Sequence, residues 1–248
     1  MKYAWILVAA LLPASAAIAQ NSIPPGTLLP ISLDTGLSAA RLHAGQTIHG
    51  RVMQDIPGTP VRRHNLVIGH VVEVQAAHSG QARLEISFDS VKTRDGVIPI
   101  RADLRAMASM MAVEDAKIPE EMADRATPPE VATTEQIGGE QVYRGGGPVT
   151  AGDQIVGKPL SYGVLGVPRP NVEGDCRGAV GGNNQPQALW LFSTDACGLY
   201  GFDGLQIQHR GRTAPAGQIV LTSTKRKLDV ASGSGLLLRI EAEQDGRS

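Results

Sequence analysis

The sequence predicts a mainly β protein, a small antiparallel barrel or sandwich with a long irregular insertion and a disulfide-stapled loop. Three observations predict this class. The 29 glycines and 16 prolines make up about 18% of the 248 residues, above the roughly 12% of an average protein, which favours short strands joined by turns. Several short stretches alternate apolar and polar residues, the period of a half-buried strand. The two cysteines flank a segment rich in glycine and asparagine.

The first 19 residues have the pattern of an export signal. Lys2 supplies a positive charge, residues 4–12 form an apolar run, and a small-x-small cleavage motif ends at Ala19. A retained membrane anchor is the alternative, but the run is shorter than the roughly 20 apolar residues of a spanning helix. We therefore expect a signal peptide over residues 1–19 and a mature chain that starts at Gln20 and has no transmembrane span. The protein would then be exported to the periplasm or outer cell envelope.

Residues 20–111 are expected to form the first part of a β domain. Strands are predicted at residues 27–33, 45–56, 65–77, 82–93 and 97–108. The second of these should bury Ile48 and Val52 on one face, and the third is apolar enough to be covered on both faces. Asp95-Gly96 predicts a tight turn, which makes residues 97–108 the hairpin partner of residues 82–93.

The rest of the chain divides into two regions. Residues 112–157 are polar and rich in proline and glycine, so they predict a flexible linker or insertion with a short helix near residues 119–125. Residues 158–248 predict a disulfide-containing β region that either completes the same barrel or forms a second domain. Its strands are expected at residues 205–211, 217–224, 226–234 and 235–242, the last three as an antiparallel meander.

Export decides how the cysteines are interpreted, because an even number of cysteines in an oxidising compartment usually forms bridges. Cys176 and Cys197 lie 21 positions apart, and closing such a loop would stabilise the fold by about 3 kcal/mol. Free buried thiols are one alternative. A metal site would need ligands beyond the nearby His209, and a thiol nucleophile would need a base that the sequence does not display. We predict a disulfide.

The other polar residues give no complete catalytic signature. The pairs His43 and His49, and His64 and His70, are each six residues apart, so each pair lies about 20 Å apart along a strand, too far to share a metal. Asp89 and Asp95 could be the two carboxylates of a glycosidase, but an Asp-Gly turn explains Asp95 without catalysis. We predict no metal, no cofactor and no enzymatic activity.

Three aromatic residues are the candidates for ligand or partner contact. Trp190 and Phe192 share one face of a predicted strand, and Tyr200 follows the second cysteine. Core packing is the simpler interpretation of the first two, and a binding platform formed with Tyr200 is the alternative. The net charge of −1 argues against an electrostatic nucleic-acid binder.

A family resemblance extends these expectations. The segments "IPPGTLLPISLDTGLSAARLHAGQTIHGRVMQDI", "LVIGHVVEV", "ISFDSVKTRDGVIPIRA" and "KLDVASGSGLLLRIEAE" resemble the carboxy-terminal β-barrel domain of the TrbI-like family. Those proteins span the envelope in bacterial conjugation and type IV secretion channels. The resemblance implies a barrel and a link to a secretion or conjugation apparatus. Members usually carry an amino-terminal membrane helix and a proline-rich spacer, where this chain has the predicted signal.

Two functions follow as hypotheses. The first is an exported, non-enzymatic β domain that binds or scaffolds other envelope proteins. The second is a secreted hydrolase or small-ligand-binding protein with its site in the loop between Cys176 and Gly201. The oligomeric state is left open.

Overall fold

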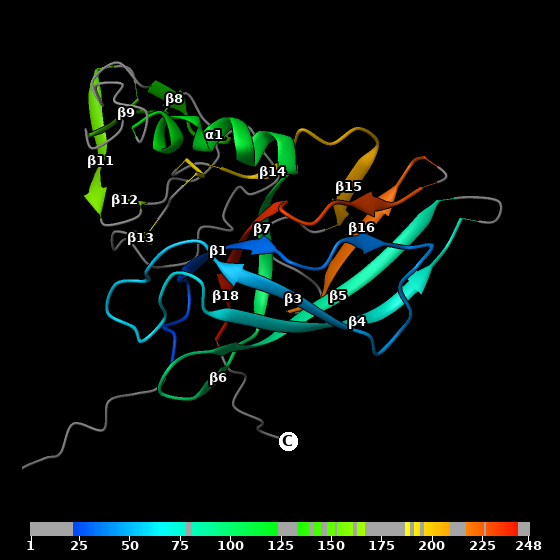
Figure 1. The fold of residues 1–248 in the computed structure, drawn as a ribbon. Coiled ribbons are helices and arrows are strands. Elements are labelled where there is room, and N and C mark those ends of the chain that lie inside the picture. The colour runs from blue at the N-terminus through cyan, green and yellow to red at the C-terminus, as the bar shows by residue number, and fades with distance from the viewer. Residues whose placement is uncertain are drawn as a thin grey trace, which may run out of the picture.

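The computed structural model describes residues 22–77, 81–123, 133–138, 141–144, 148–151, 153–160, 163–166, 187–188, 191–193, 196–208, 217–225 and 227–242. The predicted signal peptide and Gln20 lie outside these ranges. The fold is mainly β, as predicted. In these ranges it consists of a large sheet that nearly closes into a barrel, a smaller sheet, a two-stranded ladder and one helix, which lies above the barrel and beside the smaller sheet in the view of Figure 1.

The barrel is a ten-stranded sheet with the order β14-β7-β18-β1-β3-β4-β5-β16-β15, and β6 pairs with β5 beside this path. Its strands are β1 (Leu28–Leu33), β3 (Thr47–Val52), β4 (Leu66–Gln75), β5 (Ala82–Lys92), β6 (Val97–Pro99), β7 (Ala102–Ala108), β14 (Gly198–Tyr200), β15 (Leu205–Gln208), β16 (Ile219–Ser223) and β18 (Gly235–Ile240). A separate two-stranded ladder joins β2 (Leu37–Ser38) to β17 (Asp229–Val230).

The chain itself brings the two ends of the large sheet together. The end strands are β14 and β15, which follow each other in sequence with only residues 201–204 between them. The barrel is therefore nearly closed here by a short turn. No ladder of hydrogen bonds joins β14 to β15 among the described residues.

The other elements form an insertion between β7 and β14. Helix α1 (Met110–Ala123) begins two residues after β7, and six short strands follow in an antiparallel sheet with the order β13-β12-β11-β10-β9-β8. These strands are β8 (Thr133–Glu135), β9 (Gln141–Arg144), β10 (Val149–Ala151), β11 (Gln154–Leu160), β12 (Gly163–Gly166) and β13 (Gln187–Ala188). The region predicted as a linker or insertion, residues 112–157, thus contains strands β8 to β10 and most of α1, and it ends within β11. The helix starts earlier than predicted.

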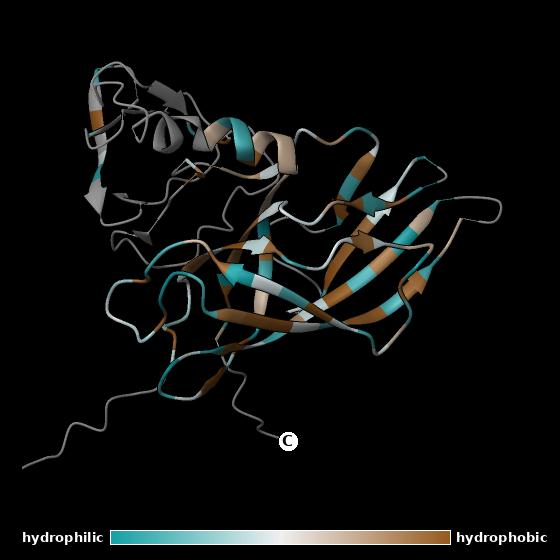
Figure 2. Cartoon of the chain, viewed as in Figure 1, coloured by the Kyte–Doolittle hydropathy of each residue, from teal (hydrophilic) through white to brown (hydrophobic). Residues whose placement is uncertain are grey.

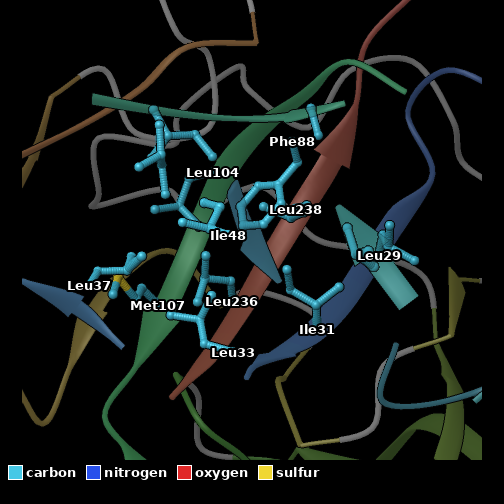
Figure 3. Packing of buried hydrophobic residues seen from close by; sticks show 14 of the residues in the cluster. Leu29, Ile31, Leu33, Leu37, Ile48, Phe88, Leu104, Met107, Leu236 and Leu238 are labelled. Atoms are coloured by element: carbon cyan, nitrogen blue, oxygen red, sulfur yellow. The ribbon is translucent and has the colours of Figure 1, made fainter. Parts of the chain in front are cut away.

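Apolar side chains from every wall fill the barrel. Figure 3 shows Ile31, Ile48 and Phe88 packed with leucines from β1, β7 and β18, and these three side chains are fully buried. The alternation that predicts β3 and β5 is confirmed, since Ile48, Val52, Leu84, Ile86 and Phe88 all point into the core. Figure 2 shows the matching bands of apolar and polar residues along β4 and β5.

Two predictions about single strands need correction. Strand β4 is not covered on both faces, because Val67, Gly69 and Val71 are buried while Ile68 and His70, which alternate with them, are only half-buried. The apolar run of β4 belongs to a strand with one face in the barrel core and the other partly exposed to solvent. The segment 97–108 is also not one hairpin partner, since only β6 pairs with β5 after the predicted Asp95-Gly96 turn, while β7 pairs with β18 and β14.

The predicted carboxy-terminal meander is wrong. Strand β16 pairs with β15 and β5, β17 pairs with β2, and β18 lies between β1 and β7. These three strands are consecutive in sequence but occupy different parts of the molecule. The barrel is also not purely antiparallel, because β14 runs parallel to β7.

A polar clamp closes the barrel at the start of β7, where β14 does not reach. Asp103 is fully buried, and its Oδ1 accepts a hydrogen bond from the backbone N–H of Gly217, just before β16, at 2.8 Å. Its Oδ2 lies 3.6 Å from Nη2 of Arg239 on β18, and Arg239 also pairs with Glu241. Gly217 has a φ of 83°, and a Cβ there would overlap the Arg101 side chain. Asp103 thus joins β7 to the segment just before β16, on the other side of the opening.

Replacing Asp103 should weaken the whole fold. We expect Asp103→Ala to lower the free energy of unfolding by about 3 kcal/mol, because it removes one member of a buried ion pair together with the acceptor for Gly217. Asp103→Asn keeps an acceptor and should lose less. Urea denaturation followed by circular dichroism measures both.

The matched control for this clamp is Asp203→Ala, which removes an exposed carboxylate paired with Lys225. An exposed pair contributes little, so the free energy of unfolding should change by less than about 0.5 kcal/mol. Equal losses in the Asp103→Ala and Asp203→Ala variants would contradict the clamp.

Candidate functional site at the barrel–insertion junction

The insertion is packed on the outer face of the barrel wall formed by β1, β7 and β18. A second hydrophobic cluster lies there, separate from the barrel interior. From the barrel it contains Leu28, Ala106, Ala108 and Leu237, and from the insertion Val113, Ala116, Ile137, Leu191, Phe192 and Ala196. Since β7 also faces the barrel core, all seven of its residues are buried. The insertion is therefore anchored to the barrel through apolar packing.

Tyr200 organises the last part of the insertion. Its hydroxyl accepts a hydrogen bond from the backbone N–H of Cys197 at 2.9 Å and donates one to the Cys197 carbonyl at 2.8 Å. Gly138 lies against the phenol with a φ of 84°, and a Cβ at this position would overlap the hydroxyl. The Cys197 backbone uses both the donor and the acceptor of the Tyr200 hydroxyl. The hydroxyl therefore fixes the conformation of the loop around Cys197.

A buried arginine fixes the same segment to the barrel. Arg105 on β7 is 1% exposed, and its Nε donates a hydrogen bond to the Ala196 carbonyl at 2.7 Å. Burying a guanidinium is unfavourable unless it is well hydrogen-bonded, so this contact defines where the chain at Ala196 can lie. Arg105 thus holds the end of the insertion directly above β7.

The two connections between barrel and insertion also contact each other. The Ser109 N–H, in the link between β7 and α1, donates a hydrogen bond to the Tyr200 carbonyl at 2.9 Å. The Ser109 Oγ accepts one from Ala112 N–H at 3.2 Å, which caps the first turn of α1. The chain therefore leaves and re-enters the barrel at one place.

The structure brings some of the predicted contact residues to this junction. Phe192 is fully buried in the second hydrophobic cluster, so it packs the core and offers no surface to a ligand. Tyr200 is half-buried and engaged with Cys197. Trp190 and Cys176 lie outside the described residues, so the Cys176–Cys197 bridge stays a prediction. Phe192 therefore cannot be part of the predicted ligand-binding platform.

No sequence pattern indicated the roles of Arg105, Ser109 and Gly138. Arg105 occupies a position of the strand pattern that normally faces solvent, and the sequence does not reveal that the insertion covers it. Glycine and serine are common in loops, so Gly138 and Ser109 carry no specific pattern either. Their functions depend on contacts with residues far away in sequence.

A histidine–aspartate pair on the barrel surface was also not predicted. The register between β4 and β5 shifts at Asp89, which is left as the extra residue of a β-bulge. Asp89 is therefore inside a strand and not at its end, and its Oδ2 lies 2.7 Å from Nδ1 of His70. Both side chains are 44% exposed. Asp95 lies in the predicted turn, separate from this pair.

Other charged residues on the same two strands form ion pairs, one across the ladder and one along β5. Arg83 contacts the carboxylates of Glu73 and Glu85. Partial burial alone would lower the pKa of Arg83, but the hydrogen bonds to Glu85 and Glu73 favour the charged form and raise it. Within the described ranges, no group of three or more His, Cys, Asp or Glu side chains could hold a metal ion.

Comparisons with known proteins add no assignment. No protein-family model matches the chain, and no curated protein matches it. In the part of the chain that the structure describes, no helix is both long and apolar enough to cross a membrane.

Removing the Tyr200 hydroxyl should loosen the Cys197 loop without unfolding the barrel. We expect Tyr200→Phe to lower the free energy of unfolding by about 1–2 kcal/mol, because the Cys197 N–H and carbonyl both lose their partner. Hydrogen–deuterium exchange should show faster exchange at the Cys197 amide. The amide of Leu221 in β16 serves as the control and should be unaffected; an unchanged Cys197 amide would contradict the role given to Tyr200.

Proposed function

We propose that the chain is an exported, non-enzymatic module that binds or scaffolds other proteins in the bacterial cell envelope. The observation that supports this most directly is the packing of the barrel. Its interior is occupied by apolar side chains from every wall, so the barrel serves as a rigid support and not as a container for a small ligand. The polar groups at the junction hold the insertion in place, which is a structural task.

The insertion is the proposed binding element. In its sheet, β8 pairs only with β9 and β13 pairs only with β12 among the described residues. Edge strands offer backbone donors and acceptors to a strand of another protein, a common mode of recognition. A sheet held on a rigid barrel could bind a partner in this way without large ordering costs.

The location in the envelope rests on the sequence. The signal pattern that ends at Ala19 supports export, and the TrbI-like resemblance of the barrel segments supports a link to a secretion or conjugation apparatus. Many unrelated proteins share barrels of this kind, so the proposed link to a secretion apparatus rests on the sequence segments alone.

We expect export to be visible in the mature chain and in its partners. The tagged protein should be recovered from the envelope fraction with Gln20 as its first residue, and crosslinking should capture envelope proteins. Amino-terminal sequencing and mass spectrometry of the crosslinked species measure this. A variant lacking residues 2–19 is the control and should stay in the cytoplasm without these partners. Recovery of the exported form as a free monomer would contradict the scaffolding role.

The proposed disulfide can be tested separately. Under denaturing, non-reducing conditions, the mature protein should show no reactive thiols, and two should appear after reduction. Cys176→Ser should expose one thiol, that of Cys197, without a reductant. Two reactive thiols in the unreduced wild-type chain would contradict the bridge while leaving the scaffolding proposal open.

A further inference from the structure

Two neighbouring methionines at the start of α1 are exposed. Met111 is 63% exposed and Met110 is 40% exposed. Met107, only three residues earlier on β7, is fully buried in the barrel core. A thioether reacts with oxidants according to its exposure, so these three residues should differ widely in reactivity.

We propose that Met110 and Met111 form an oxidation site, and that the modification of Met110 loosens the contact between α1 and the barrel. The oxidant would be a peroxide. The methionine sulfur attacks one peroxide oxygen, the O–O bond breaks, and the sulfur becomes a sulfoxide while the peroxide is reduced to water. The thioether loses two electrons and the peroxide gains them, so no further reactant is needed.

The two methionines have different surroundings. Met110 lies against Gly233 in the turn before β18, since its Cγ and Sδ would be 3.1 and 3.7 Å from a Cβ built on that glycine. The same turn is tied to β1, because the Gly233 N–H donates to the Leu33 carbonyl at 2.7 Å. Neither methionine is part of a hydrophobic cluster, and Met111 is the more exposed of the two.

These differences give the two residues different roles. A sulfoxide is polar and larger than a thioether, so at Met110 it would disturb the close packing on Gly233. Helix α1 leaves the barrel at this point, and its next turn anchors the insertion through Val113. Oxidation of Met111 adds a polar group that already faces solvent, and it should be structurally silent. Met110 would therefore sense the oxidant, and Met111 would react first.

The experiment treats the folded protein with hydrogen peroxide and follows each methionine by peptide mass spectrometry. Met111 should be oxidised first, Met110 next, and both at least about tenfold faster than Met107, which reacts only when the fold opens. In urea, where the fold is lost, all three should react at similar rates. Comparable oxidation rates for Met107 and Met111 in the folded protein would overturn the proposed oxidation site.

The structural effect is measured by hydrogen exchange at the Val113 amide, which bonds to the Ser109 carbonyl at 3.0 Å. Peroxide should speed this exchange by about threefold or more in wild type and in Met111→Leu. It should have no effect in Met110→Leu, which keeps an apolar side chain on Gly233. An equal increase in Met110→Leu, or no increase in wild type, would overturn the role of Met110. The inference does not depend on the proposed location.

Discussion

The hydrogen bond from Gly217 to the buried carboxylate of Asp103 is the constraint on which the barrel depends. Strand β14 pairs only with the end of β7, between Ala106 and Ala108, so no strand among the described residues pairs with the start of β7 on that side. The Asp103 side chain makes the connection there that a ladder of backbone hydrogen bonds would otherwise make. Because Arg239 of β18 shares the same carboxylate, the clamp connects β7 and β18 to the segment just before β16. A buried ion pair of this kind contributes more to defining one geometry than to net stability.

The barrel core and the insertion together make β7 a strand with two buried faces. One face packs in the barrel core, and the other carries Arg105, Ala106 and Ala108 toward the insertion. Both connections of the insertion lie at the end of this strand, where Ser109 bonds to the Tyr200 carbonyl. The barrel wall and the insertion therefore share one anchoring strand. A disturbance at the start of α1 reaches the barrel through the turn at Gly233, and one at Tyr200 reaches it through β14.

The local pattern of the sequence predicted much of the barrel. The alternation around Ile48 and Ile86 identified β3 and β5, and Asp95-Gly96 identified the turn before β6. Burial on one face requires such alternation regardless of which strands lie alongside. The candidate site was less predictable. Of the aromatic residues singled out, Tyr200 organises the junction and Phe192 packs inside it, while the arginine and glycine that complete the junction had no local signature.

The sequence by itself determined that this is a β protein with short strands, and it determined which faces of several strands are apolar. Only the tertiary structure decided how the strands are joined. Strands β16 and β18 lie close in sequence, yet one pairs with β5 and the other with β1 and β7, because pairing depends on which edges are left open when the barrel closes. The same holds for Asp103, which looks like an ordinary polar residue of an alternating strand. Its burial and its bond to Gly217 follow from chain segments more than a hundred residues apart, and no local pattern encodes a contact at that separation.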